Sequence, residues 1–229
     1  MKSNLYTASM IVSLLLFPLY GYASVEAIST VKLYGLKYVT KYEILNNAVM
    51  SKDGRLFVDM KKLNNSLQNN PMIESYTVDT NNNILTVKVK EKDILAIVLI
   101  EKGNDTIPIE VDSHLKIIST YRVHAYDRPI IKITQDEVYH NKLSPRIIKI
   151  LMIMNKLKND QGQAIGRISI IDCISPFVSY VSIHGLQTRY IWDETYEGIS
   201  LMYSVPGLLD SKSHCPGNGV VTQKRIVVW

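Results

Sequence analysis

The pattern of apolar and polar residues predicts a series of short elements in the first half of the chain. Apolar and charged residues alternate from Leu85 to Glu91, which is typical of a half-buried strand. Thr40 and Glu43 have the spacing of a capping box, and they predict a short helix that ends near Val49. Asp59 is the expected cap of the next helix. The predicted order is strand, helix, helix, strand and strand, over residues 27–34, 40–49, 60–68, 72–79 and 84–91, with turns at 51–54 and 81–83.

The second half of the chain mixes one long amphipathic segment with strand-like runs. Ser144 followed by Pro145 is a favourable start for a helix, because serine caps and proline fits the first turn. The apolar residues that follow recur at helical spacing and are interpreted as a face packed on a core, with a partner-binding helix as the alternative. Strands are predicted over residues 94–101, 107–111, 164–174, 177–184, 188–192 and 220–229, with a second helix over 193–209.

The N-terminal segment lacks charge between Lys2 and Glu26, and residues 5–23 are mostly apolar. As a helix, this segment would span roughly 28 Å, about the hydrocarbon thickness of a bilayer. Small residues at Gly21 and Ala23 also fit the cleavage region of a secretory signal. The sequence leaves the membrane anchor and the cleaved signal as alternatives. Both place the rest of the chain outside the cytoplasm.

The charge pattern does not favour nucleic-acid binding. The chain has 26 basic and 21 acidic residues, a net charge of +5, and the two signs are interspersed. The tightest basic pairs, Lys61-Lys62 and Lys224-Arg225, are too short to follow a phosphate backbone. We therefore expect no nucleic-acid partner.

No pattern of reactive residues predicts an enzyme. The five histidines are scattered, and the chain has no metalloprotease motif, phosphate-binding loop or nucleophile elbow. Of the two cysteines, Cys173 lies in an apolar run typical of a buried side chain, and a disulfide with Cys215 is the alternative outside the cytoplasm. We expect no catalytic residues, metal site, cofactor or small-molecule substrate.

Several short strings carry a family resemblance. They are the strand end V-K-L-Y-G at 31–35, the turn G-R-L-F-V-D at 54–59, the helix stop N-P-M-I at 70–73, and the strand V-K-V-K-E at 87–91. Together they resemble a POTRA domain, in which Phe57 would fill the space between two helices and the sheet. The order of the whole chain resembles the FtsQ/DivIB family of bacterial division proteins.

The resemblance implies an α+β fold in three parts. Residues 1–24 would form a transmembrane helix or signal segment, residues 27–93 a POTRA domain of order β-α-α-β-β, and residues 94–229 a β-rich domain with two helices. The implied function is a non-catalytic scaffold at the division septum, anchored in the inner membrane through residues 5–23, with most of the chain outside the cytoplasm. A periplasmic POTRA protein of outer-membrane assembly or secretion, and an exported enzyme of unknown chemistry, are the alternatives.

The last predicted strand is the candidate partner-binding site. At a sheet edge, its unpaired N–H and C=O groups could accept an added strand; inside the sheet, it would only complete the core, and the residues leave both arrangements open. The resemblance favours the edge, because FtsQ/DivIB proteins dock the FtsB–FtsL coiled-coil pair in the region of their last strand. It implies an FtsB/FtsL-like pair and septal synthase components as partners. The candidate residues are Thr222, Gln223, Lys224, Arg225, Ile226, Val227, Val228 and Trp229.

Overall fold

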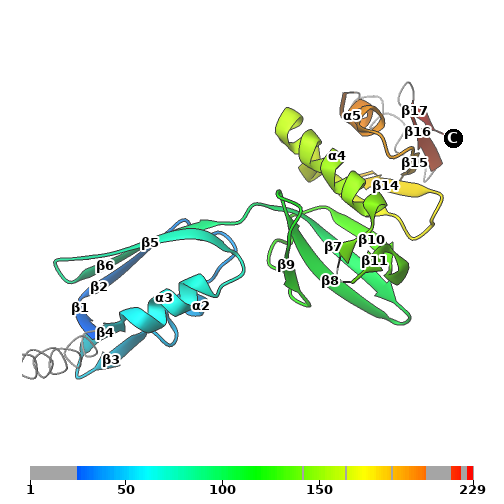
Figure 1. Cartoon of the computed structure of the whole chain (residues 1–229). Coiled ribbons are helices and arrows are strands. Elements are labelled where there is room, and N and C mark those ends of the chain that lie inside the picture. Colours follow the sequence, from blue (N-terminus) through cyan, green and yellow to red (C-terminus); the bar gives the residue numbers. More distant parts are fainter. Residues whose placement is uncertain are drawn as a thin grey trace, which may run out of the picture. The chain divides into compact units, whose positions relative to one another are not determined.

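The chain divides into two compact units, with the boundary between Glu91 and Lys92 (Figure 1). The computed structural model describes residues 25–140, 142–162, 164–186, 188–204, 218–222 and 226–228. Strands make up 46% of the structure, which also has four α-helices within this described part. None of the helices in the described ranges is long and apolar enough to cross a membrane, and the predicted anchor or signal at 1–24 lies outside them.

The N-terminal unit contains two three-stranded sheets, of order β1-β4-β3 and β2-β6-β5. β2 runs parallel to β6, and the other neighbouring strands are antiparallel. The apolar core is formed mainly by Ile44, Val58, Leu63, Leu67 and Leu85, all buried. The elements are β1 (Val25–Ile28), β2 (Thr30–Tyr34), α2 (Lys41–Leu45), β3 (Val49–Lys52), β4 (Arg55–Asp59), α3 (Met60–Gln68), β5 (Ile73–Asn81) and β6 (Ile84–Glu91).

The predicted fold class, with a transmembrane helix, a β-α-α-β-β POTRA domain and a β-rich domain with two helices, is wrong. The N-terminal unit has the order β-β-α-β-β-α-β-β, and no membrane-spanning helix is found in the described ranges. The strand predicted over 27–34 is two strands, β1 and β2, which belong to separate sheets. The other difference arises at Asp53 and Gly54, whose positive φ angles of 51° and 74° form the tight hairpin turn between β3 and β4. Phe57 lies in β4, where it is paired with Met50 and is half-buried.

Several local predictions in this unit are confirmed. Thr40 and Glu43 form the capping box of α2, although this helix ends at Leu45 and not near Val49. Asp59 caps α3 by accepting a hydrogen bond from the backbone N–H of Lys62 at 3.0 Å. Asn82 and Asn83 adopt φ angles of 51° and 60° in the turn between β5 and β6. These features depend on neighbouring residues, which is why the sequence predicts them.

The turn after β2 is fixed by a glycine and a carboxylate. Gly35 has a φ of +80°, and a Cβ atom placed there would lie 1.9 Å from the carbonyl oxygen of Val89. The carboxylate of Glu91 accepts hydrogen bonds from the backbone N–H groups of residues 37–39, at 2.8, 2.8 and 3.0 Å. Both residues belong to the strings that carry the family resemblance, and their task in the structure is to hold this turn against β6.

The C-terminal unit is built on a nine-stranded mixed sheet of order β17-β16-β15-β14-β13-β10-β7-β8-β9. The β7–β10, β10–β13 and β15–β16 pairs are parallel. The elements are β7 (Ile94–Lys102), β8 (Asp105–Asp112), β9 (Ile117–Thr120), β10 (Ile130–Thr134), η2 (Gln135–Glu137), β11 (Val138–Tyr139), β12 (Lys142–Leu143), α4 (Pro145–Gln161), η3 (Ala164–Arg167), β13 (Ile168–Asp172), β14 (Ser179–Ile183), β15 (Arg189–Trp192), α5 (Tyr196–Ser204), β16 (Asn218–Val221) and β17 (Ile226–Val228).

Helix α4 packs against one face of this sheet (Figure 1). Ser144 caps it by accepting a hydrogen bond from the backbone N–H of Ile147 at 3.3 Å, and Pro145 occupies the first turn, as predicted. The interpretation of its apolar stripe as a core face is confirmed. The buried residues of α4 are Ile147, Ile150, Leu151, Met154 and Leu157.

Other predictions in this unit need correction. The strand predicted over 164–174 begins as a 3-10 turn, and only Ile168–Asp172 is extended. β9 and β10 lie in a stretch for which no strand was predicted. The strand predicted over 220–229 is two antiparallel strands, β16 and β17. Cys173 is a buried free cysteine, and Cys215 lies outside the described residues.

Candidate partner-binding edge

The C-terminal residues form one end of the nine-stranded sheet. β16 pairs in parallel with β15, where Trp192 lies opposite Val221. β17 then returns antiparallel to β16, with Ile226 opposite Val221 and Val228 opposite Gly219. In the part of the chain that the structure describes, β17 has a sheet neighbour on one side only. As far as the described residues go, no strand occupies its other side, where an additional strand could pair with its backbone N–H and C=O groups.

The edge rests on a well-packed support. Tyr190, Trp192 and Val221 are buried in the main core together with Ile199 and Met202 of α5. The indole N–H of Trp192 donates a hydrogen bond to the carbonyl oxygen of residue 195 at 3.0 Å, which ties β15 to the start of α5. A rigid support of this kind limits the conformational entropy that strand addition would cost.

The candidate residues predicted from the sequence fall partly within the described ranges. Thr222 follows β16 and is half-buried, while residues 226–228 form β17. Gln223, Lys224, Arg225 and Trp229 lie outside the described residues. Among the described strands β17 is therefore the outermost of the sheet, which agrees with one of the two arrangements left open by the sequence.

A polar cluster stabilises the same end of the unit. The guanidinium of Arg146, at the start of α4, donates hydrogen bonds to Glu194 at 2.7 Å, to Ser179 at 3.0 Å and to the carbonyl oxygen of Ser175 at 2.9 Å. It also lies 3.3 Å from a carboxylate oxygen of Glu137. These contacts connect α4 with β14 and with the loop after β15, so they hold the platform beneath the candidate edge.

Burial and hydrogen bonds set the protonation states of the groups in this cluster. Burial alone would raise the pKa of Glu194, but hydrogen bonds from Arg146 and Ser179 hold that pKa below its usual value of 4.5. Burial raises the pKa of the Cys173 thiol to about 11, so the thiol is protonated at neutral pH and is a poor nucleophile. A cavity of about 450 Å³ lies beside Arg146, but the arginine is already committed to its partners.

A second buried polar group lies on β8. Glu110 is fully buried and accepts hydrogen bonds from the hydroxyl of Ser119 at 2.6 Å and from the backbone N–H groups of His124 and Ala125 at 2.7 and 2.8 Å. The ring nitrogen Nδ1 of His124 lies 2.7 Å from oxygen Oε2 of the same Glu110 carboxylate. Burial alone would raise the pKa of Glu110, but its hydrogen bonds hold that pKa below 4.5. The carboxylate thereby fixes the loop that follows β9.

Sequence reasoning missed both of these groups. In the run I-P-I-E-V at 107–111, Glu110 lies between Ile109 and Val111, which belong to the core. What covers it is a loop that lies 14 residues further along the chain. Arg146 and Glu194 are separated by 48 residues, and no local pattern indicates their contact.

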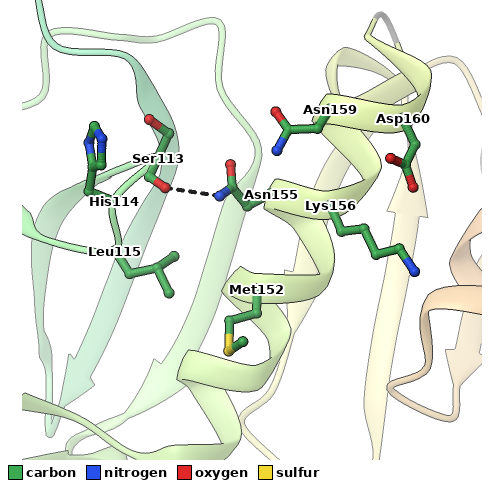
Figure 2. Close-up of a pocket in the computed structure, with 8 residues that line it drawn as sticks. All are labelled: Ser113, His114, Leu115, Met152, Asn155, Lys156, Asn159 and Asp160. Atoms are coloured by element: carbon green, nitrogen blue, oxygen red, sulfur yellow. Dashed lines mark hydrogen bonds between the residues drawn. The ribbon is translucent and has the colours of Figure 1, made fainter.

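A hollow of about 420 Å³ lies between α4 and the turn that joins β8 to β9 (Figure 2). The side-chain amide of Asn155 crosses it and donates a hydrogen bond to the carbonyl oxygen of Ser113 at 2.9 Å. Met152 lies below this bond in the view, and Lys156 and Asp160 point away from His114. No group of three or more potential metal ligands lies together in the described ranges.

Comparisons with known proteins leave the chain without an assigned family. No protein-family model matches it, and no curated protein matches its sequence. The resemblance to FtsQ/DivIB proteins consequently depends on the short strings described above.

Proposed function

We propose that this protein is a non-catalytic scaffold that binds other membrane proteins of the bacterial divisome through the sheet edge formed by β17. The observation that carries the proposal is the position of β17 (Ile226–Val228) at the end of the nine-stranded sheet, with β16 on one side. A partner segment that adds to this edge gains main-chain hydrogen bonds, and its alternate side chains supply specificity.

The choice of partner rests on the resemblance to the FtsQ/DivIB family. The strings at 31–35, 54–59, 70–73 and 87–91 support it, and Gly35 and Glu91 have clear tasks within those strings. The proposed partners are an FtsB/FtsL-like coiled-coil pair and septal synthase components. The protein would be held in the inner membrane through residues 5–23, with most of the chain outside the cytoplasm.

The proposal that the protein is non-catalytic is supported by the hydrogen bonds of its buried polar groups and by the protonation of its buried thiol. Arg146, Glu194 and Glu110 are engaged in hydrogen bonds within the fold, and the Cys173 thiol has a pKa of about 11. Groups held in this way stabilise loops and helix ends.

Crosslinked affinity capture from native membranes tests the proposal. The full-length chain should recover small single-pass coiled-coil division proteins and septal synthase components, identified by mass spectrometry. A chain that ends before Lys224 should lose them, while amide exchange in β14 and β15 shows that the platform remains folded. Undiminished capture by the truncated chain would contradict the assignment of the edge. Recovery of outer-membrane assembly proteins by the full-length chain would contradict the divisome role.

A further inference from the structure

The nine-stranded sheet has a second edge strand, at the end opposite to β17. In the described ranges, β9 (Ile117–Thr120) pairs with β8 on one side and with no strand on the other (Figure 1). Ile117 is paired with Val111 across a register shift of the β8–β9 ladder, and it lines the same hollow as Ile148 of α4, so it lies on the face that α4 covers. Val111 belongs to the core that α4 covers. The core face of the sheet therefore continues to β9, where Ile117 is 38% exposed.

Beside β9, this face ends in an open hollow of about 400 Å³. Its apolar lining comes from two stretches of the chain: Leu115 and Ile117, just before and at the start of β9, and Leu143 and Ile148, in β12 and α4. Leu143 is buried, and Leu115 and Ile148 are half-buried. A strand added to β9 would extend the sheet at this hollow, and every second side chain of that strand would face the same side as Ile117. The lining residues are Leu115, Lys116, Ile117, Lys142, Leu143 and Ile148.

The charged residues of this lining are all basic. Lys116 and Lys142 are exposed, and the structure gives neither ammonium group an ion pair with any described residue. Apolar side chains in the centre of an incoming segment would be buried by Leu115, Ile117 and Ile148. Acidic side chains at its ends would meet the two lysines. Charge complementarity of this kind selects an acidic segment over a basic one.

We propose that the edge of β9, together with this hollow, is a second docking site that takes an extended segment of a partner protein with alternate apolar residues and acidic ends. The site is independent of β17, because seven strands of the same sheet separate the two. With both edges in use, the C-terminal unit would hold two partner segments at the two ends of one rigid sheet.

A designed peptide provides the probe. The sequence Glu-Thr-Val-Thr-Val-Thr-Val-Thr-Glu places its valines and both glutamates on one face of a strand, and a matched peptide carries lysine in place of glutamate. Binding of each labelled peptide to the purified full-length chain in mild detergent is measured by fluorescence anisotropy. The glutamate peptide should bind more tightly than the lysine peptide, and amide exchange should slow in residues 117–120.

Charge reversal identifies the site. The double variant Lys116→Glu/Lys142→Glu should bind the glutamate peptide about tenfold more weakly and should prefer the lysine peptide, because two exposed ion pairs are replaced by repulsion. The control Lys102→Glu reverses an exposed charge of the same unit outside the hollow and should change nothing. Truncation before Lys224 should also leave binding intact.

Three results would overturn the proposal. They are failure of the folded chain to bind the glutamate peptide, equal binding by the charge-reversed variant, and slowed exchange at β17 in place of β9. The first two results leave the capture of partners by β17 untouched, and the third would assign the peptide to the β17 edge, so the two proposals fail separately.

Discussion

Each unit uses one carboxylate to hold a loop, and the two carboxylates work in different surroundings. Glu91 is half-buried and accepts three backbone hydrogen bonds from residues 37–39, beside a glycine whose conformation completes the turn. Glu110 is fully buried and binds one hydroxyl, two backbone N–H groups and a histidine ring. The N-terminal unit thus depends on backbone geometry at a few turns. The C-terminal unit depends on buried polar groups within a large core, which makes it sensitive to protonation.

The largest effect is expected from Gly35→Ala. Alanine at a φ of +80° is strained, and its Cβ atom would lie 1.9 Å from the carbonyl oxygen of Val89, so the pairing of β2 with β6 must shift. We expect the N-terminal unit to lose about 3–4 kcal/mol in free energy of unfolding, as measured by urea titration with amide exchange resolved along the chain.

Gly54→Ala is the matched control for this change. Gly54 has a similar φ of +74°, but nothing lies within 4 Å of an added Cβ atom. We expect a loss of about 1 kcal/mol from strain alone. An equal loss in the two variants would show that the contact with β6 is unimportant.

The second largest effect is expected from Glu110→Gln, which tests whether the C-terminal unit depends on an ionised buried carboxylate. Because the folded-state pKa of Glu110 is lowered, its ionisation stabilises the fold above the unfolded value near 4.5, and this contribution is lost as the pH falls through the folded pKa. The variant should lose about 2 kcal/mol at pH 7, since a neutral amide replaces a carboxylate that accepts several hydrogen bonds.

The pH dependence provides the control for that variant. Below pH 4.5, the free energy of unfolding of the C-terminal unit should fall less steeply in Glu110→Gln than in the unmodified chain. Glu194, whose pKa is also lowered, should supply the remaining slope. Identical slopes in the two proteins would mean that Glu110 does not contribute to acid sensitivity.

The smallest effect is expected from Thr40→Ala. This change removes the hydroxyl that accepts a hydrogen bond from the backbone N–H of Glu43, and so breaks the capping box of α2. The expected loss is about 1 kcal/mol in the N-terminal unit, measured by the same urea titration. A loss as large as that of Gly35→Ala would mean that the helix cap, and not the turn after β2, is the main support of this unit.

The sequence predicted those parts of the fold that depend on neighbouring residues. Thr40, Asp59 and Ser144 cap the helices expected from them, and the buried stripe of α4 is the one read from its spacing. The β3–β4 hairpin was missed because Asp53 and Gly54 were recognised as a turn without the strands on either side. The sheet order around β10 depends on parallel pairs between strands distant in sequence, and no local pattern encodes it.

In the candidate site, too, the sequence predicts the local features but not the contacts between distant residues. Residues 220–229 were recognised as β-rich, but the structure divides them between two antiparallel strands, β16 and β17. The support from Arg146 and Glu194 depends on a contact across 48 residues. An edge strand can be suspected from composition. Its position at the end of a sheet is a property of the whole topology.

The most direct test of the central claim is amide hydrogen exchange at Ile226–Val228, compared between the free full-length chain and the complex recovered by affinity capture. Strand addition at β17 predicts that exchange at these residues slows markedly in the complex, because their free backbone groups become hydrogen-bonded to the partner. Unchanged exchange at Ile226–Val228 with the partner bound would contradict the claim that β17 is the docking edge.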